Sequence, residues 1–169
     1  QEVASLFISD DNRRLVHARS RDSQEAAIYI AEDGSPAFEL LLESYHRYRS
    51  DGWFRMMDVS PDFMHIYNLS MNLKSHDGGQ SWQAVLANET DAIFRFIKLD
   101  REQPGIVWIG GESLGFFPIL LYADNYGDDF EWLPLYASFF NGDNATHWLI
   151  RDQQKWYVPG EGIICMSQD

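Results

Sequence analysis

Residues 45–53 gather the side chains that are best suited to bind a ligand. Within nine residues this segment holds three aromatic rings and two arginines. Aromatic rings offer stacking faces, and guanidinium groups offer paired donors for a carboxylate or a sulfate. With two arginines from a preceding segment, the expected ligand-binding residues are Arg19, Arg21, Tyr45, Arg47, Tyr48, Arg49 and Trp53. In the alternative interpretation, the arginines pair with Asp22, Glu43 and Asp51, and the rings pack between structural elements.

Other patterns that could support catalysis or metal binding are weak. No G-x-S-x-G motif occurs, the five histidines lack metal-ligand spacing, and a single cysteine excludes an internal disulfide framework. The 26 acidic residues offer too many carboxylate pairs to assign one to glycoside hydrolysis. We therefore expect no metal and no cofactor, and no catalytic residue is assigned.

Composition and charge exclude several classes of protein. The chain has 169 residues, of which 45% are hydrophobic, so we expect one folded domain with its own core. A net charge of −13 argues against nucleic-acid binding, which depends on basic residues. No apolar run reaches the length needed to cross a bilayer, so membrane insertion is not expected.

One short motif recurs along the chain at a nearly constant interval. Residues 75–82 read S-x-D-x-G-x-x-W, residues 31–38 and 123–130 keep parts of this pattern, and residues 167–169 match its first and third positions. The starting positions 31, 75, 123 and 167 are separated by 44, 48 and 44 residues. A period of this length, with short β-rich segments, is expected of a β-propeller blade.

The motif residues have a structural explanation. A Ser or Asp side chain can accept hydrogen bonds from backbone N–H groups in a hairpin turn, Gly supplies the positive φ, and the aromatic ring covers the turn. One carboxylate per turn falls short of the six to eight oxygens that Ca²⁺ prefers. We therefore assign a structural role to Asp33, Phe38, Ser75, Asp77, Gly79, Trp82, Asn125, Gly127, Phe130, Ser167 and Asp169.

Short segments rich in β-branched, aromatic and aliphatic residues surround each motif and predict four strands per repeat. The expected strands of the first two repeats are 5–9, 15–18, 27–31, 38–42, 54–59, 65–70, 73–75 and 82–86. Those of the last two are 93–99, 105–110, 119–123, 131–135, 148–151, 155–158 and 163–167. A helix over 38–48 is the main alternative, but its apolar pattern is short and lacks caps.

These residues and their spacing resemble the Asp-box, or BNR-repeat, superfamily of β-propellers, which includes sialidases and sortilin-type receptor domains. The resemblance implies an all-β fold of four-stranded antiparallel blades, with each box between the third and fourth strands, on the face away from the usual ligand site. The blades would span about 1–46, 47–91, 92–140 and 141–169, the last incomplete. About 3.7 blades would then be present, as a piece of a larger propeller with further blades.

The resemblance to sialidases is limited. The first conserved element of sialidases starts with Phe-Arg and continues with Ile-Pro. Residues 54–57 and 94–97 also start with Phe-Arg, but neither continues with Ile-Pro. Arg55 and Arg95 would lie on the first strands of their blades. We therefore expect a non-catalytic platform that binds a glycan, peptide or protein partner through loops opposite the boxes, with part of a sialidase-like glycoside hydrolase as the alternative.

Two further features bear on partners and location. The segment 110–118 is expected to be a long loop in which Phe116 and Phe117 either form a partner surface or pack inside the protein. Three N-x-S/T sequons begin at Asn68, Asn88 and Asn144, which favours a secreted or extracellular protein.

Overall fold

The protein is an all-β chain. The computed structural model describes residues 2–20, 25–45, 56–87, 92–101, 103, 105–113, 118–133, 150–152, 155–160 and 163–166. These residues form strands β1 to β15 joined by turns, with no helix among them. The expected all-β class is therefore confirmed, and the helix considered over 38–48 is replaced over its first part by a strand, β4 (Glu39–Tyr45).

The chain divides into two compact units. The first comprises Gln1–Arg49 and Met57–Ala87 and contains two four-stranded antiparallel sheets. The first sheet consists of β1 (Glu2–Ile8), β2 (Arg14–Arg19), β3 (Glu25–Ala31) and β4. The second sheet consists of β5 (Met57–Val59), β6 (Ile66–Asn68), β7 (Leu73–Ser75) and β8 (Gln83–Ala84).

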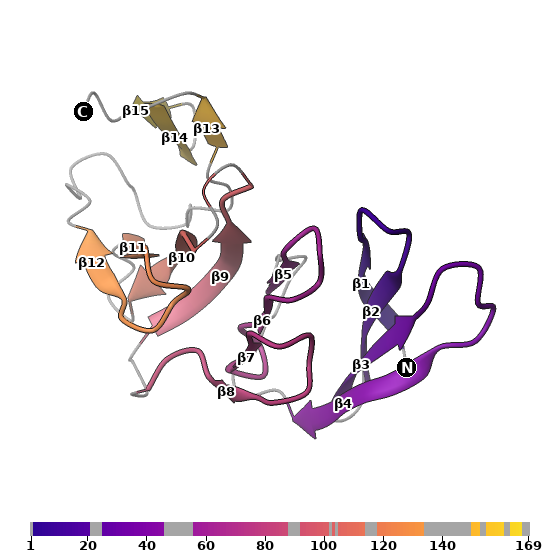
Figure 1. Cartoon of the computed structure of the whole chain (residues 1–169). Coiled ribbons are helices and arrows are strands. Elements are labelled where there is room, and N and C mark those ends of the chain that lie inside the picture. The colour runs from indigo at the N-terminus through magenta and orange to yellow at the C-terminus, as the bar shows by residue number, and fades with distance from the viewer. Residues whose placement is uncertain are drawn as a thin grey trace. The chain divides into compact units, whose positions relative to one another are not determined.

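The second unit comprises Ser50–Met56 and Asn88–Asp169. Its four-stranded third sheet consists of β9 (Ala92–Leu99), β10 (Val107–Ser113), β11 (Pro118–Ala123) and β12 (Glu131–Leu133). Its three-stranded fourth sheet consists of β13 (Ile150–Asp152), β14 (Lys155–Gly160) and β15 (Ile163–Met166). In all four sheets, each strand pairs with the strand next to it in sequence (Figure 1).

A hydrophobic core joins the two sheets of the first unit. Leu15 and Ile28 of the first sheet are fully buried in one cluster with Met57, Val59 and Ile66 of the second. We call the side of the first sheet that carries Leu15 and Ile28 its inner face. Burial of large aliphatic side chains of this kind stabilises a fold by about 1.5–3 kcal/mol each.

The opposite side of the first sheet, its outer face, is also apolar. The strand register places Leu6 opposite Val16, Val16 opposite Tyr29, and Tyr29 opposite Leu40, so these side chains share one side. In contrast to the inner face, this side is open. Its exposed apolar residues are Val3, Leu6, Ile8, Leu40 and Tyr45.

Several expected segments need correction. The strand expected over 65–70 covers only Ile66–Asn68, because the chain turns directly after it and the Asn72 N–H donates to the Leu69 carbonyl oxygen. The strand expected over 82–86 covers only Gln83–Ala84, because the buried Asn72 side chain instead accepts a hydrogen bond from the Leu86 N–H and donates one to its carbonyl oxygen. The long loop expected over 110–118 is shorter, because β10 continues to Ser113 by pairing with β9, and β11 begins at Pro118. Phe116 and Phe117 lie outside the described residues.

Candidate functional site

The strongest copy of the repeated motif forms a closed network in the turn between β7 and β8. The hydroxyl of Ser75 accepts the Gly79 N–H at 2.8 Å and donates to the Asp77 carboxylate at 2.8 Å. The same carboxylate accepts the Ser81 N–H at 2.9 Å and the Ser81 hydroxyl at 2.6 Å. The Trp82 indole N–H then donates to the Gly79 carbonyl oxygen at 3.0 Å, so the ring is fixed over the turn.

The carboxylate of Asp77 is held ionised by this turn. The hydrogen bond from the Ser81 hydroxyl contributes most, followed by the Ser81 N–H and the Ser75 hydroxyl, and together they lower the pKa of Asp77 from 3.8 to about 2. Each carboxylate oxygen accepts at least one donor of the same turn. This arrangement organises the turn and makes Asp77 a poor candidate for a catalytic acid at neutral pH.

Weaker copies of the motif lie at the same position in two other sheets. In the turn between β11 and β12, the Asn125 side-chain oxygen accepts the N–H groups of Asp128 and Asp129. Gly127 has a φ of 71°, as the motif requires at this position. In the turn between β3 and β4, Gly34 has a φ of 70° and Asp33 is exposed. Ser167 and Asp169 of the fourth copy lie outside the described residues.

A histidine pair lies beside the strongest motif. His65, just before β6, and His76, just after β7, bring their Nδ1 atoms to 3.1 Å, and the rings meet edge to face. Of the two facing imidazole nitrogens, one donates and the other accepts. Spacing in the sequence did not indicate this pair, because it arises from the register between two strands.

The opposite end of the first sheet carries two of the expected ligand-binding residues. Arg19 ends β2 and Tyr45 ends β4, and the register places Arg19 across from Ala26, which lies across from Ser44. Tyr45 is 65% exposed. Arg19 donates to Glu2 at 2.9 Å, so it is ion-paired, although not with an acid expected from the sequence. The other expected residues, Arg21, Arg47, Tyr48, Arg49 and Trp53, lie outside the described residues.

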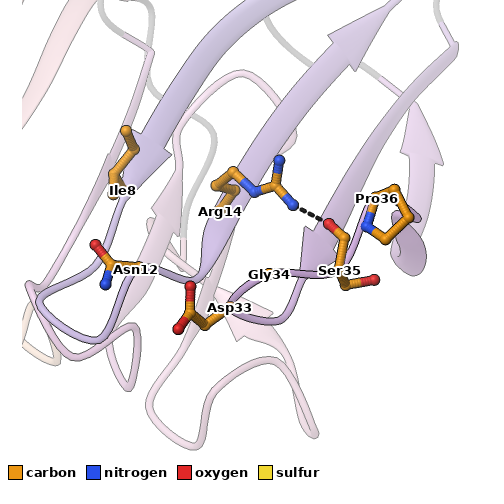
Figure 2. A pocket seen from close by; sticks show the side chains of 7 residues that line it. All are labelled: Ile8, Asn12, Arg14, Asp33, Gly34, Ser35 and Pro36. Carbon is orange, nitrogen blue, oxygen red and sulfur yellow. Dashed lines mark hydrogen bonds between the residues drawn. The ribbon is translucent and has the colours of Figure 1, made fainter.

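A shallow pocket of about 470 Å³ lies at the motif end of the first sheet (Figure 2). The Arg14 guanidinium lies over the Phe38 ring, 5.3 Å from its centre, and donates to the Ser35 carbonyl oxygen. This pocket was not expected from the sequence, because it forms where the start of β2 lies beside the turn after β3. Its lining residues are Ile8, Asn12, Arg14, Asp33, Gly34, Ser35 and Pro36.

The residues that would test the sialidase alternative are only partly described. Arg95 lies half-buried on β9, next to the register shift opposite Gly110 and Gly111, while Arg55 lies outside the described residues. Among the residues with defined positions, no group of three or more His, Cys, Asp or Glu side chains could hold a metal ion.

One sequon is unsuited to glycosylation in the folded protein. Asn68 is fully buried, and its side-chain oxygen accepts the Ser70 hydroxyl and the Met71 N–H. Asn88 and Asn144 lie outside the described residues. No helix in the described part of the chain is long and apolar enough to cross a membrane.

Comparison with known proteins adds no family assignment. No protein-family model matches the chain, and no curated protein matches it either.

Proposed function

We propose that the chain is part of an Asp-box β-propeller that acts as a non-catalytic binding platform. Its ligand would be a glycan, a peptide or a protein, and binding would take place on the side away from the boxes. Three consecutive four-stranded meanders, each with a motif turn between its third and fourth strands, support the blade interpretation. The observation that carries the proposal is the contrast between the two ends of the first sheet.

At the box end, arginine side chains are engaged within the protein. In the turn between β1 and β2, Arg13 donates both to Asp11 and to the Asp62 carbonyl oxygen. At the opposite end, Arg19 is ion-paired with Glu2, but Tyr45, which closes β4, is exposed. Residues 46–53 follow Tyr45 directly in the sequence and add two more arginines and two more aromatic rings. Exposed arginines and aromatic rings recur where proteins recognise carboxylates, sulfates and sugars.

The remaining blades of the propeller are the expected structural partners, and the sequons at Asn88 and Asn144 favour a secreted or extracellular location. The sequon at Asn68 adds no support because its side chain is buried. The net charge of −13 argues against a nucleic acid as the ligand.

Binding of the full-length protein to an array of sulfated, carboxylated and neutral glycans tests the proposal. The double variant Arg47→Ala/Arg49→Ala should weaken the strongest interaction at least about tenfold, as expected when charge-assisted hydrogen bonds are lost. Arg13→Ala is the matched control, because Arg13 lies at the box end and should leave binding unchanged. Equal binding by both variants would contradict the proposed surface.

A parallel assay with a fluorogenic sialoside addresses the alternative of a glycoside hydrolase. The non-catalytic proposal predicts no turnover by the full-length protein. Turnover that is lost in Arg55→Ala or Arg95→Ala would overturn it in favour of the sialidase-like alternative.

A further inference from the structure

Two Asp-Gly pairs occupy the same place in two copies of the motif. Asp33 and Gly34 form the first pair, in the turn between β3 and β4, and Asp77 and Gly78 form the second, in the turn between β7 and β8. Both glycines have a φ of 70°. The two pairs therefore match in sequence, in motif position and in the backbone conformation of the glycine, and they differ in their surroundings.

An Asp-Gly pair is able to rearrange through its own backbone. The Gly nitrogen attacks Cγ of the protonated Asp side chain, and the carboxyl hydroxyl leaves as water with the amide proton, so that a cyclic succinimide forms. Water then opens the ring, and where it breaks the bond between the nitrogen and the main-chain carbonyl carbon, the chain continues through Cγ as isoaspartate. The reaction needs an available Gly nitrogen and a carboxyl carbon that can approach it, and the absence of a side chain on glycine leaves the approach open.

The second pair is held against this reaction at both reacting groups. The Gly78 N–H donates to the Met64 carbonyl oxygen at 3.0 Å, so the attacking nitrogen is engaged. The Asp77 carboxylate accepts hydrogen bonds from Ser81 and Ser75, which fix its position and lower its pKa to about 2. Because the carboxylate stays ionised, its carbon is a poor target for a nucleophile.

The first pair lacks these hydrogen bonds because the motif is degenerate there. Ala31 stands in the place of Ser75, so the first hydroxyl donor is missing. Ala37 stands in the place of Ser81, so the second hydroxyl is missing as well. The Ala37 N–H donates to the Ser35 hydroxyl at 3.2 Å and not to a carboxylate.

Asp33 and Gly34 are also open to their surroundings. Both are exposed, and both line the shallow pocket at the motif end of the first sheet (Figure 2). Nothing lies within 4 Å of a Cβ built on Gly34, whereas a Cβ on Gly78 would have the Phe63 carbonyl oxygen at 3.8 Å. Within the described part of the chain, no hydrogen bond holds the Asp33 carboxylate or the Gly34 N–H.

We infer that Asp33 and Gly34 form a site of spontaneous succinimide formation and isoaspartate modification, whereas the equivalent pair of Asp77 and Gly78 is protected in the folded protein. The isoaspartate adds one methylene carbon to the backbone of the turn, just before Ser35, whose carbonyl oxygen accepts a hydrogen bond from Arg14. The modification therefore changes the wall of the pocket. It goes beyond the proposed ligand-binding surface, which lies at the opposite end of the first sheet.

Peptide mapping of the aged protein tests the inference. Trypsin places the two pairs in separate peptides, 22–47 and 75–95, and the Asp-Gly pair at 51–52 and the Asn-Gly pair at 141–142 in others. The folded full-length protein is incubated at mildly acidic pH, and chromatography with fragmentation locates the isoaspartate. It should accumulate at Asp33 at least about tenfold faster than at Asp77, because breaking one hydrogen bond to a charged group accounts for such a factor. Equal rates, including no reaction at either site, would overturn the inference.

Unfolding the chain separates the effect of the fold from that of the sequence. In urea the rates at the two pairs should converge, because the hydrogen bonds that protect Asp77 and Gly78 are lost. A difference that persists in urea would assign the protection to the neighbouring residues in the sequence and overturn the inference.

Substitutions in the folded protein test the cause of the protection. Ser81→Ala should speed the reaction at Asp77, and Ala37→Ser should slow it at Asp33 by restoring a hydroxyl donor. Gln80→Ala is the matched control, because the Gln80 side chain binds the Asp77 carbonyl oxygen and not its carboxylate. Equal rates in Ser81→Ala and Gln80→Ala would overturn the inference. Ligand binding measured on the same aged samples separates this site from the proposed function, since either result can fail alone.

Discussion

The side chain of Leu41 occupies the space in which a Cβ atom on Gly79 would lie. A Cβ built on Gly79 would be 2.7 Å from Leu41 Cδ2, and the φ of Gly79 is 90°. Leu41 belongs to the first sheet and Gly79 to the motif turn of the second, so the contact joins two sheets of the first unit. Glycine at this position of the motif therefore serves packing between sheets as well as the shape of the turn.

Gly79→Ala should destabilise the first unit more than Gly34→Ala does. Both glycines have a positive φ, but nothing lies within 4 Å of a Cβ on Gly34. The clash with Leu41 should add about 1–3 kcal/mol to the loss in the free energy of unfolding, as overpacking in a dense core does. Urea unfolding measures both variants. Equal losses would show that Leu41 moves away without cost.

The Asp77 turn predicts a pH dependence of stability. Folding lowers the pKa of Asp77 from 3.8 to about 2, so its stabilising contribution is complete above the unfolded-state value and is lost as the pH falls toward about 2. The difference in unfolding midpoint between the parent protein and Asp77→Asn should therefore shrink between pH 4 and pH 2 by this linkage. A difference that stays constant over this range would contradict the assignment.

Ser81→Ala tests the cause of the same shift. The Ser81 hydroxyl makes the largest contribution to the low pKa of Asp77, so its removal should move the pKa back toward 3.8. The Ser81 N–H and the Ser75 hydroxyl remain, so the return should be incomplete. An NMR titration of the Asp77 carboxyl carbon measures the change, and an unshifted titration would contradict this ranking of the hydrogen bonds.

Two adjacent glycines on β10 should respond differently to alanine. A Cβ on Gly111 would lie 2.2 Å from the Ile93 carbonyl oxygen, which is backbone, whereas a Cβ on Gly110 would lie 2.1 Å from the Phe96 ring. Because a side chain can move and a paired backbone cannot, Gly111→Ala should be the more damaging substitution. Phe96→Leu should partly rescue Gly110→Ala in a double-mutant cycle. If the stability losses of Gly110→Ala and Phe96→Leu simply add in the double variant, the proposed clash between Gly110 and Phe96 is contradicted.

Asn72 should be hard to replace, because its buried side chain satisfies both backbone groups of Leu86. Asn72→Ala leaves a buried donor and a buried acceptor without this partner and should cost about 2–4 kcal/mol. Asn72 also has a φ of 57°. Asn72→Gly, which suits the backbone better but lacks the amide, separates the two effects. If Asn72→Gly recovers the stability that Asn72→Ala loses, backbone strain and not the lost hydrogen bonds dominates the effect.

The strand positions could be predicted well because they depend on local patterns. Apolar and β-branched segments interrupted by Asp, Asn and Gly placed β7 at its observed bounds, Leu73–Ser75. The errors arose where a tertiary contact decides the boundary. Asn72 shortens β8 by binding Leu86, and pairing with β9 extends β10 through Ser113.

The candidate sites were less predictable, because register and not sequence spacing brings their residues together. The ion pair of Arg19 is with Glu2, which lies directly across from it on β1, whereas the sequence pointed to acids nearby in the chain. The pair of His65 and His76, and the pocket around Arg14, likewise arise from neighbouring strands and turns. No local pattern in the sequence encodes such pairs.

The pairing of every strand with its sequence neighbour has a consequence for biosynthesis. Each described sheet needs only short chain closures, such as the turns after Ile8 and Val59, so its strands can pair as soon as they have left the ribosome. No strand of these sheets must wait for a distant segment to complete its hydrogen bonds. A nascent chain that is still being synthesised could thus already contain fully paired sheets. The formation of sheets does not depend on later synthesis, whereas the covering of their apolar faces does.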